Sequence, residues 1–185
     1  MRIRRFNLLD MAAVVMLYRV CYAEGPWFEF FDPKDVEEEF LEILSWIDSI
    51  FLVCEDHGRI VGASIGFPIE HKPDVLASIL QTTSRGFYFA DLFVDPSMRN
   101  RGIGKYLMQE RYAMAMHLEY KIGIVRTSVA QPIIQHLYVD QLGYRIVAKQ
   151  ETLSTKVVDG VTQQATDTRV IMMGNLFPQI TTCEQ

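Results

Sequence analysis

A basic, glycine-containing loop at residues 99–104 constrains the fold of this chain more than any other segment. The loop reads Arg99-Asn100-Arg101-Gly102-Ile103-Gly104; it follows an apolar, strand-like run from Phe87 to Val94 and opens a helix-like segment from Gly102 to Leu118. Free N–H groups at a helix N-terminus carry partial positive charge, and glycines let the backbone approach a bulky anion. The arginines add charge that suits phosphate oxygens. The segment therefore predicts a phosphate-binding loop between a strand and a helix.

The spacing of the glycines excludes two common phosphate loops. A Walker loop needs G-x-x-x-x-G-K-[ST], and the run that begins at Gly102 lacks that order. A dinucleotide-binding loop needs a third glycine or alanine three residues after the second, where this chain has Leu107. What remains is R-x-x-G-x-G after a strand, a pattern that a simple helix cap in an unrelated protein also produces.

A second motif lies about thirty residues downstream, from Gln131 to Tyr144. Together the two motifs resemble those of the GCN5-related N-acetyltransferase (GNAT) superfamily, [QR]-x-x-G-x-[GA] followed by N-x-x-A-x-x-L-Y-x-x-x-G-[FY]. Gln131 stands where the family usually has Asn, and Ile134 where it has Ala. The matching positions of the second motif are Leu137, Tyr138, Gly143 and Tyr144. The resemblance covers residues 86–147, the expected acyl-CoA-binding core of a single domain spanning residues 1–185.

The apolar periodicity along the chain predicts an α+β fold. Strands are expected at residues 2–8, 50–55, 59–67, 86–94, 122–127, 145–153 and 168–173, with 157–164 as a polar connector. Helices are expected at 11–22 (capped by Asp10), 34–47, 102–118 and from Pro132 to Gly143, with a short one from Val75 to Leu80. The resemblance implies a matching architecture: a mixed, mostly antiparallel sheet of about seven strands, flanked by about four helices and splayed between its fourth and fifth strands.

The resemblance also implies acetyl-CoA as a cosubstrate that lodges in this opening. Strand backbone at residues 92–94 would pair with the pantetheine amides, and the loop would hold the pyrophosphate. The residues expected to bind it are Leu92, Phe93, Val94, Arg99, Asn100, Arg101, Gly102, Ile103, Gly104, Lys105, Gln131 and Tyr138.

Acylation of an amine by a thioester raises two proton-transfer problems. The departing thiolate gains from a proton donor, and a tyrosine with a pKa of ~10 can supply that proton. Tyr138 stands where the family has its thiolate-protonating tyrosine, so the resemblance implies that it is the general acid. A tyrosine on the inner face of a helix could also serve only the core.

The general base, which must deprotonate an amine with a pKa of ~10.4, is less well defined by the sequence. Family carboxylates align with the strand face that here carries Ala90 and Tyr88, and Tyr88 is therefore a candidate catalytic residue. Asp91 is the only acid in that strand, but strict alternation puts it on the opposite face unless a bulge intervenes. Water, Glu24 and Glu29 are the other candidates.

An aromatic segment before Asp32 is the expected acceptor site, together with the connection from His71 to Gly86. Such rings can line an apolar or cation–π pocket, or can equally plug the space between the first two helices. The acceptor is expected to be a small-molecule amine or a protein amine. The candidate substrate-binding residues are Trp27, Phe28 and Phe31.

Composition narrows the partners of the protein. A net charge of −5 and a pI near 5.4 argue against a nucleic-acid or anionic-membrane binder, and no segment is long enough to cross a membrane. Cys21, Cys54 and Cys183 suggest free thiols in a reducing, cytoplasmic setting, and neither they nor the histidines have metal-ligand spacing. Homodimers are common in the family. A longer acyl donor and a non-catalytic acyl-CoA-binding sensor or scaffold are the alternatives to an acetyltransferase.

Overall fold

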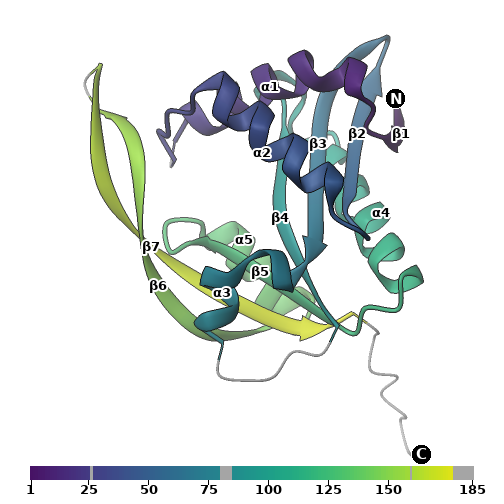
Figure 1. The fold of residues 1–185 in the computed structure, drawn as a ribbon, viewed down its shortest axis with the longest axis vertical. Helices are drawn as coiled ribbons and strands as arrows, with labels where there is room; N and C mark the ends of the chain where they lie inside the picture. Colours follow the sequence, from purple (N-terminus) through teal and green to yellow (C-terminus); the bar gives the residue numbers. More distant parts are fainter. Residues whose placement is uncertain (26, 80–84, 159, 177–185) are drawn as a thin grey trace, which may run out of the picture.

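A computed structural model describes residues 1–25, 27–79, 85–158 and 160–176. These residues form a seven-stranded sheet in the order β1-β2-β3-β4-β5-β7-β6 (Figure 1). All neighbouring strands are antiparallel except β4 and β5, which are parallel. The strands are β1 Arg2–Arg5, β2 Ile50–Asp56, β3 Arg59–Pro68, β4 Gly86–Val94, β5 Ile122–Ser128, β6 Arg145–Val158 and β7 Val161–Asn175. The expected α+β class and mixed, mostly antiparallel sheet are confirmed.

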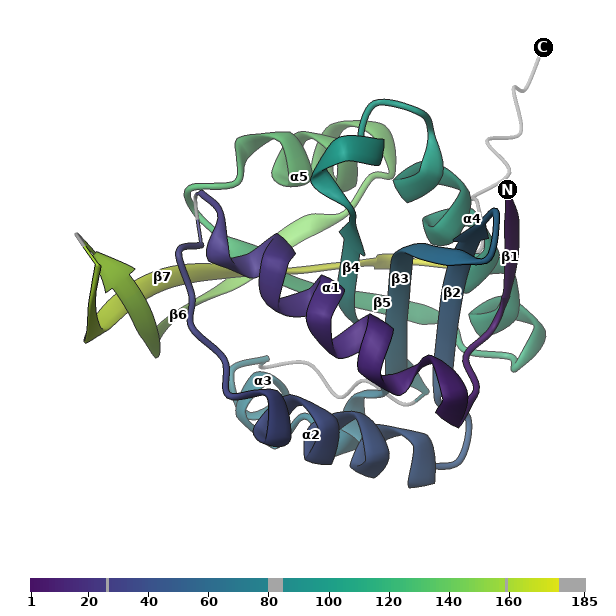
Figure 2. The ribbon, with the colours of Figure 1, turned by 90° about the horizontal axis from the view of Figure 1, so that it is seen from above.

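Helices cover both faces of this sheet (Figure 2). One face carries α1 (Met11–Ala23) and α2 (Pro33–Ser45), and the other carries α4 (Ile103–His117). The described residues also include the short helices α3 (Pro73–Ala77) and α5 (Pro132–His136), so the total is five, where about four were expected. Leu80, the expected end of the α3 segment, lies outside the described residues, as does Cys183. None of the described helices is long and apolar enough to span a membrane.

Helix α2 shows how local sequence builds these layers. Asp32 accepts a hydrogen bond from the Lys34 N–H at 2.8 Å and caps the helix, and Pro33 suits its first turn. The apolar side chains Val36, Phe40 and Ile43 recur at helical spacing and are fully buried against the sheet. The opposite, acidic face of the helix stays exposed.

The N-terminal strand is shorter than the periodicity predicts. It ends at Arg5, and Asn7 then caps a 3₁₀ turn over Leu8–Asp10 by accepting from the Leu9 N–H at 2.9 Å. Asp10 occupies the N-cap position of α1 as predicted, but its side chain makes no capping hydrogen bond to that helix, and two guanidinium nitrogens of Arg4 hold its carboxylate at 2.7 and 2.8 Å. The same carboxylate also accepts from the Asn7 N–H at 2.9 Å, so it belongs to the 3₁₀ turn and to a partly buried ion pair.

The predicted connector at 157–164 is also wrong, because β6 and β7 pair continuously up to Val158 and Val161. This long hairpin projects beyond the rest of the sheet and curves toward the end of α1 (Figure 1). Both of its faces are largely exposed there, so the polar composition that suggested a connector is compatible with a two-stranded arm. The arm also pairs with the segment after α1, through Phe30 N–H to Thr155 O and Val157 N–H to Phe28 O, both at 2.8 Å.

Candidate active site

The parallel strands β4 and β5 separate partway along their length. They pair only where Gly86, Phe87 and Tyr88 face residues 122–124, and then continue to Val94 and Ser128 without pairing to each other. The expected splay between the fourth and fifth strands is therefore present. An open cavity of about 1440 Å³ lies along this opening, and it reaches from the basic loop at the start of α4 to the aromatic segment after α1.

The basic loop adopts a conformation that presents backbone N–H groups at the cavity. Asp95 first tightens the chain by accepting from the Ser97 N–H at 2.9 Å, and Asn100 then takes a positive φ of 61°. Gly102 is the N-cap of α4 with a φ of +82°, in the left-handed region that favours glycine. A Cβ on Gly104 would lie 3.4 Å from the Leu92 side chain, so this turn of helix packs directly on β4.

Most residues expected to bind the cosubstrate line this one cavity. Arg101 is exposed and does not line it, and the Arg99 guanidinium bonds to Glu24 at 2.9 Å and to the Val94 carbonyl at 3.2 Å. Protein groups therefore already engage the guanidinium of Arg99. The lining residues from that set are Leu92, Phe93, Val94, Arg99, Asn100, Gly102, Ile103, Gly104, Lys105, Gln131 and Tyr138.

A β-bulge in β4 decides where Asp91 points. Ile65 of β3 pairs with Asp91, but the next residue, Gly66, pairs with Phe89, which leaves Ala90 without a partner. The extra residue brings Asp91 onto the same face as Tyr88, the α1–α2 face, and overturns the placement expected from strict alternation. Asp91 accepts a hydrogen bond from the Tyr22 hydroxyl at 2.5 Å, and burial raises the pKa of its carboxyl.

The other candidate bases fit the role less well. Burial raises the pKa of Tyr88 to about 12, so very little of it is phenolate at neutral pH. Glu24 is paired with Arg99 on the surface, and Glu29 is buried in an ion pair with Arg169 at 2.8 Å. Asp91 is thus the carboxylate of β4 that can accept a proton inside the opening.

Tyr138 enters the cavity from the opposite side of the sheet to Asp91. It lies on a single π-helical turn, Leu137–Gln141, that continues α5, and its side chain packs in the cluster on the α4 face. Such turns often occur at functional sites. Its ring contacts that of Tyr144 at 5.1 Å between centroids, and burial raises the pKa of its phenol, so Tyr138 is protonated at neutral pH.

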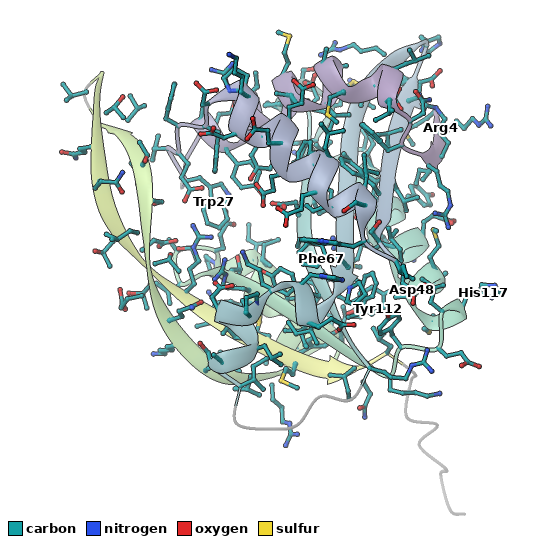
Figure 3. All side chains as sticks on the ribbon, in the orientation of Figure 1. Arg4, Trp27, Asp48, Phe67, Tyr112 and His117 are labelled. Atoms are coloured by element: carbon teal, nitrogen blue, oxygen red, sulfur yellow. The ribbon has the colours of Figure 1, made fainter. Side chains whose placement is uncertain are left out.

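The aromatic residues before Asp32 only partly form the expected acceptor pocket. Trp27 and Phe31 line the cavity, together with Phe30, whereas Phe28 does not line it and is half-exposed. Trp27 lies toward the β6–β7 arm (Figure 3), with its ring 5.7 Å from that of Tyr22 and 5.4 Å from the Arg169 guanidinium carbon. The aromatic cluster therefore spans α1 and the arm.

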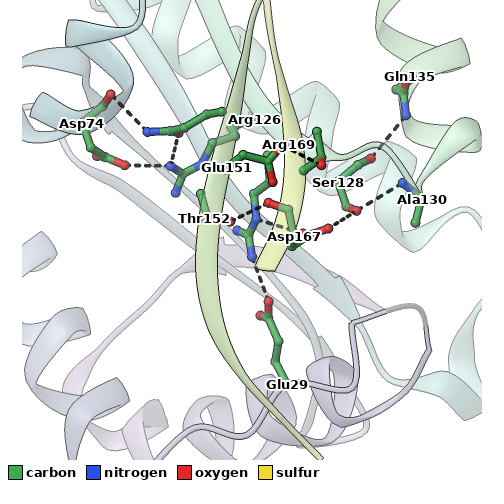
Figure 4. Close-up of polar contacts among 12 residues, drawn as sticks. Glu29, Asp74, Arg126, Ser128, Ala130, Gln135, Glu151, Thr152, Asp167 and Arg169 are labelled. Carbon is green, nitrogen blue, oxygen red and sulfur yellow. Dashed lines mark hydrogen bonds and ion pairs between the residues drawn. The ribbon is translucent and has the colours of Figure 1, made fainter. Parts of the chain in front are cut away.

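A chain of charged groups ties this segment to the sheet (Figure 4). Ser128 donates to Asp167 at 2.8 Å, Arg169 donates to Asp167 at 3.1 Å, and Arg169 also donates to Glu29 at 2.8 Å. The sequence analysis did not find Asp167 or Arg169 as site residues. No local signal could have revealed them, because Arg169 and Glu29 lie 140 positions apart and meet only through the arm.

Removing Arg169 from this series of polar contacts should destabilise the protein. We expect Arg169→Met to lower the free energy of unfolding by roughly 3 kcal/mol, because it leaves the buried Glu29 carboxylate without its cation. Denaturant unfolding would measure the loss. The double variant Glu29→Gln/Arg169→Met should recover part of it, and an equal loss in both variants would contradict the assigned ion pair.

Comparisons with known proteins agree with this geometry. A sequence model of the acetyltransferase (GNAT) family matches residues 17–144, whereas a search of curated protein sequences finds no match.

Among the described residues, no group of three or more His, Cys, Asp or Glu side chains could hold a metal ion.

Several solved structures share the fold at low sequence identity. An N-acetyltransferase from Staphylococcus aureus is 14% identical with a TM-score of 0.71, covering 95% of this chain and 98% of its own. The ribosomal-protein-alanine N-acetyltransferase from Brucella melitensis is 16% identical with a TM-score of 0.68, covering 95% and 99%. The phosphinothricin acetyltransferase from Sinorhizobium meliloti, in complex with AcCoA, is 15% identical with a TM-score of 0.65, covering 94% and 87%. The family match spans more than half of the chain, and this protein therefore belongs to the acetyltransferase (GNAT) family.

Proposed function

We propose that this protein is an N-acetyltransferase that transfers an acetyl group from acetyl-CoA to a primary amine by direct attack. The observation that carries the proposal is the β4–β5 opening, which Asp91 and Tyr138 flank from opposite faces of the sheet. The basic loop at one end of the same cavity supplies a phosphate site of the kind that acetyl-CoA requires.

The proposed reaction uses each of these groups once. Asp91 takes a proton from the acceptor ammonium, and the neutral amine nitrogen attacks the thioester carbonyl carbon. The tetrahedral intermediate gives its second amine proton to water and collapses, so that a C–N bond replaces the C–S bond and the electron pair leaves with sulfur. Tyr138 then protonates the thiolate and recovers its proton from water. The products are the N-acetyl amine and CoA.

The acceptor is proposed to be a small-molecule amine or a protein amine. The part of the cavity away from the loop is lined by Trp27, Phe30 and Phe31, and by acidic side chains of the α2 segment such as Asp35 and Glu39. Rings and carboxylates together favour a cationic group over an anionic one. This support is for an amine class, and a panel of amines is needed to choose within it.

The alternative is a non-catalytic acyl-CoA-binding sensor, which would need no carboxylate placed to act as a base. The bulge in β4 supplies one in Asp91, so the structure gives that alternative no separate support. Acetyl-CoA turnover with an amine panel separates the two readings. Binding of acetyl-CoA without any turnover would favour the sensor.

The first test is acetyl-CoA binding by calorimetry, with Gly102→Val beside the wild type. Valine is strained at a φ of +82° and would displace the N–H groups that begin α4. Loss of two charge-assisted hydrogen bonds corresponds to an affinity about a hundredfold weaker or worse.

Gly58→Val is the matched control for this test. Gly58 has a φ of +77° in the β2–β3 turn and does not line the cavity, so the variant carries a similar strain without touching the loop. It should bind acetyl-CoA like the wild type. A folded Gly102→Val protein with unchanged affinity would show that the loop is not the pyrophosphate site.

A further inference from the structure

Arg111 of α4 is a cation buried beside the cavity without a carboxylate partner. Its side chain is 2% exposed, and its Nη1 donates to the carbonyl oxygens of Ile65 and of Asp91, the latter at 2.7 Å. Its guanidinium lies over the Phe89 ring, 4.8 Å from the centroid. Within the described residues its Nε has no hydrogen-bond partner, and no ion pair with an acid is formed.

Burial of an arginine on these terms is costly for folding. Carbonyl oxygens and an aromatic face offset only part of the free-energy cost of removing a full charge from water. A buried N–H donor without a hydrogen-bond partner adds to that cost. The two carbonyls belong to the residue pair next to the bulge, Ile65 and Asp91. The same bulge that orients the Asp91 carboxylate thus anchors Arg111 at the wall of the cavity. A buried cation held rigidly at a cavity wall is suited to a transient anion.

The position of Arg111 along α4 indicates which negatively charged group of the ligand it could stabilise. It lies seven residues after Gly104 in the same helix, about 10 Å along the axis from the loop, which is too far for the pyrophosphate. Tyr138 lines the same cavity, and the Arg111 guanidinium lowers its phenol pKa against the effect of burial. The group of acetyl-CoA that becomes negative next to Tyr138 is its sulfur.

We propose that Arg111 and Tyr138 together form the site that receives the CoA sulfur, with Arg111 stabilising the thiolate as the C–S bond breaks. This inference rests on the proposed acetyl transfer. The electron pair of the C–S bond goes to sulfur, the guanidinium faces that charge, and the Tyr138 hydroxyl then donates its proton to sulfur. The resulting tyrosinate is also stabilised by Arg111 until water reprotonates it.

The test compares binding of CoA with binding of desulfo-CoA, which lacks the thiol, by calorimetry from about pH 6 to about pH 9. If Arg111 lowers the pKa of the bound thiol by one unit, CoA affinity rises relative to desulfo-CoA as the pH passes through the thiol pKa, by up to about tenfold. We expect Arg111→Gln to abolish this relative rise and Arg111→Lys to retain part of it. The other titratable groups around Arg111 are Tyr112, Tyr144 and Asp91, and they affect both ligands alike.

Arg126→Gln is the matched control, because Arg126 lines the same cavity but is already paired with Asp74 at 2.7 Å. It should keep the relative rise. Equal weakening of CoA and desulfo-CoA in Arg111→Gln, or an unchanged relative rise, would overturn the proposal and reduce Arg111 to a support for the bulge.

Two further outcomes are separable. If Arg111→Gln does not fold, the test is the ultraviolet absorbance of the thiolate of CoA bound to the wild type and to Arg111→Lys. The proposal predicts this absorbance in the wild type, and its absence there would overturn the proposal. If neither ligand binds the folded wild type, the proposed function fails and this inference fails with it.

Discussion

Replacing Tyr138 with phenylalanine should lower the turnover number by about a hundredfold or more, with little change in affinity for CoA. General acid catalysis contributes factors of roughly 10² to 10⁴, and Tyr138 is the buried, protonated phenol on the cavity wall opposite Asp91. The variant keeps the ring that packs on Tyr144, so the fold should be preserved. Steady-state kinetics beside CoA calorimetry would separate the two effects.

Tyr120→Phe is the matched control for this experiment. Tyr120 is also a buried tyrosine on the α4 face, but its hydroxyl donates to Asp48 at 3.0 Å and it does not line the cavity. Its loss should cost stability of about 1 kcal/mol and leave turnover intact. A Tyr138→Phe enzyme with wild-type turnover would remove Tyr138 from the mechanism.

The Asp91→Asn enzyme should lose about a hundredfold or more in turnover at neutral pH. The amide cannot accept the amine proton, and Asp91 is the carboxylate that the bulge directs into the opening. Burial raises the pKa of Asp91, so wild-type activity should fall as the pH drops through that raised value. This acid limb of the pH–rate profile should be absent in the variant.

Although Asp91→Asn should lower turnover, it should raise the stability of the folded protein at neutral pH. A carboxyl whose pKa is raised in the folded state favours folding when it is protonated and opposes folding as the pH rises above its unfolded value of about 3.9. Asp91→Asn should therefore raise the melting temperature more at pH 7 than at about pH 3, where both forms are neutral. Activity would be lost while stability is gained.

Glu29→Gln distinguishes Asp91 from Glu29, a buried acid that lines the same cavity. Glu29 is held by Arg169, so its replacement should reduce stability and leave the acid limb in place. If Glu29→Gln loses the acid limb and Asp91→Asn retains it, the general base is Glu29.

The sequence predicted the proposed cosubstrate-binding residues from two local motifs. A pyrophosphate loop is built from consecutive backbone groups, and the conformation of consecutive residues depends on their own types. The left-handed φ at position 102 favours a glycine, and the order of a strand, a loop and a helix follows from apolar periodicity. Tyr138 was identified through its spacing from Gly143, which is likewise local.

The placement of Asp91, the proposed general base, depends on a feature that one strand cannot encode by itself. A β-bulge is a property of a strand pair, and here β3 and β4 shift register at Ile65 and Gly66. The residues of β4 alone therefore indicated the wrong face for Asp91. The sequence gives no sign of a buried Arg111 for a related reason, because a single arginine in a helix is usually solvated. Only the tertiary structure places its guanidinium against the carbonyl oxygens at the bulge.

The sequence by itself thus determined the family, the α+β class and the glycine-containing turn that begins α4, because each rests on residues close together in the chain. The tertiary structure alone decided the face of Asp91, the burial of Arg111 and the ion pair between Glu29 and Arg169. These three depend on strand register and on contacts between distant segments, and such contacts form only when the whole sheet assembles.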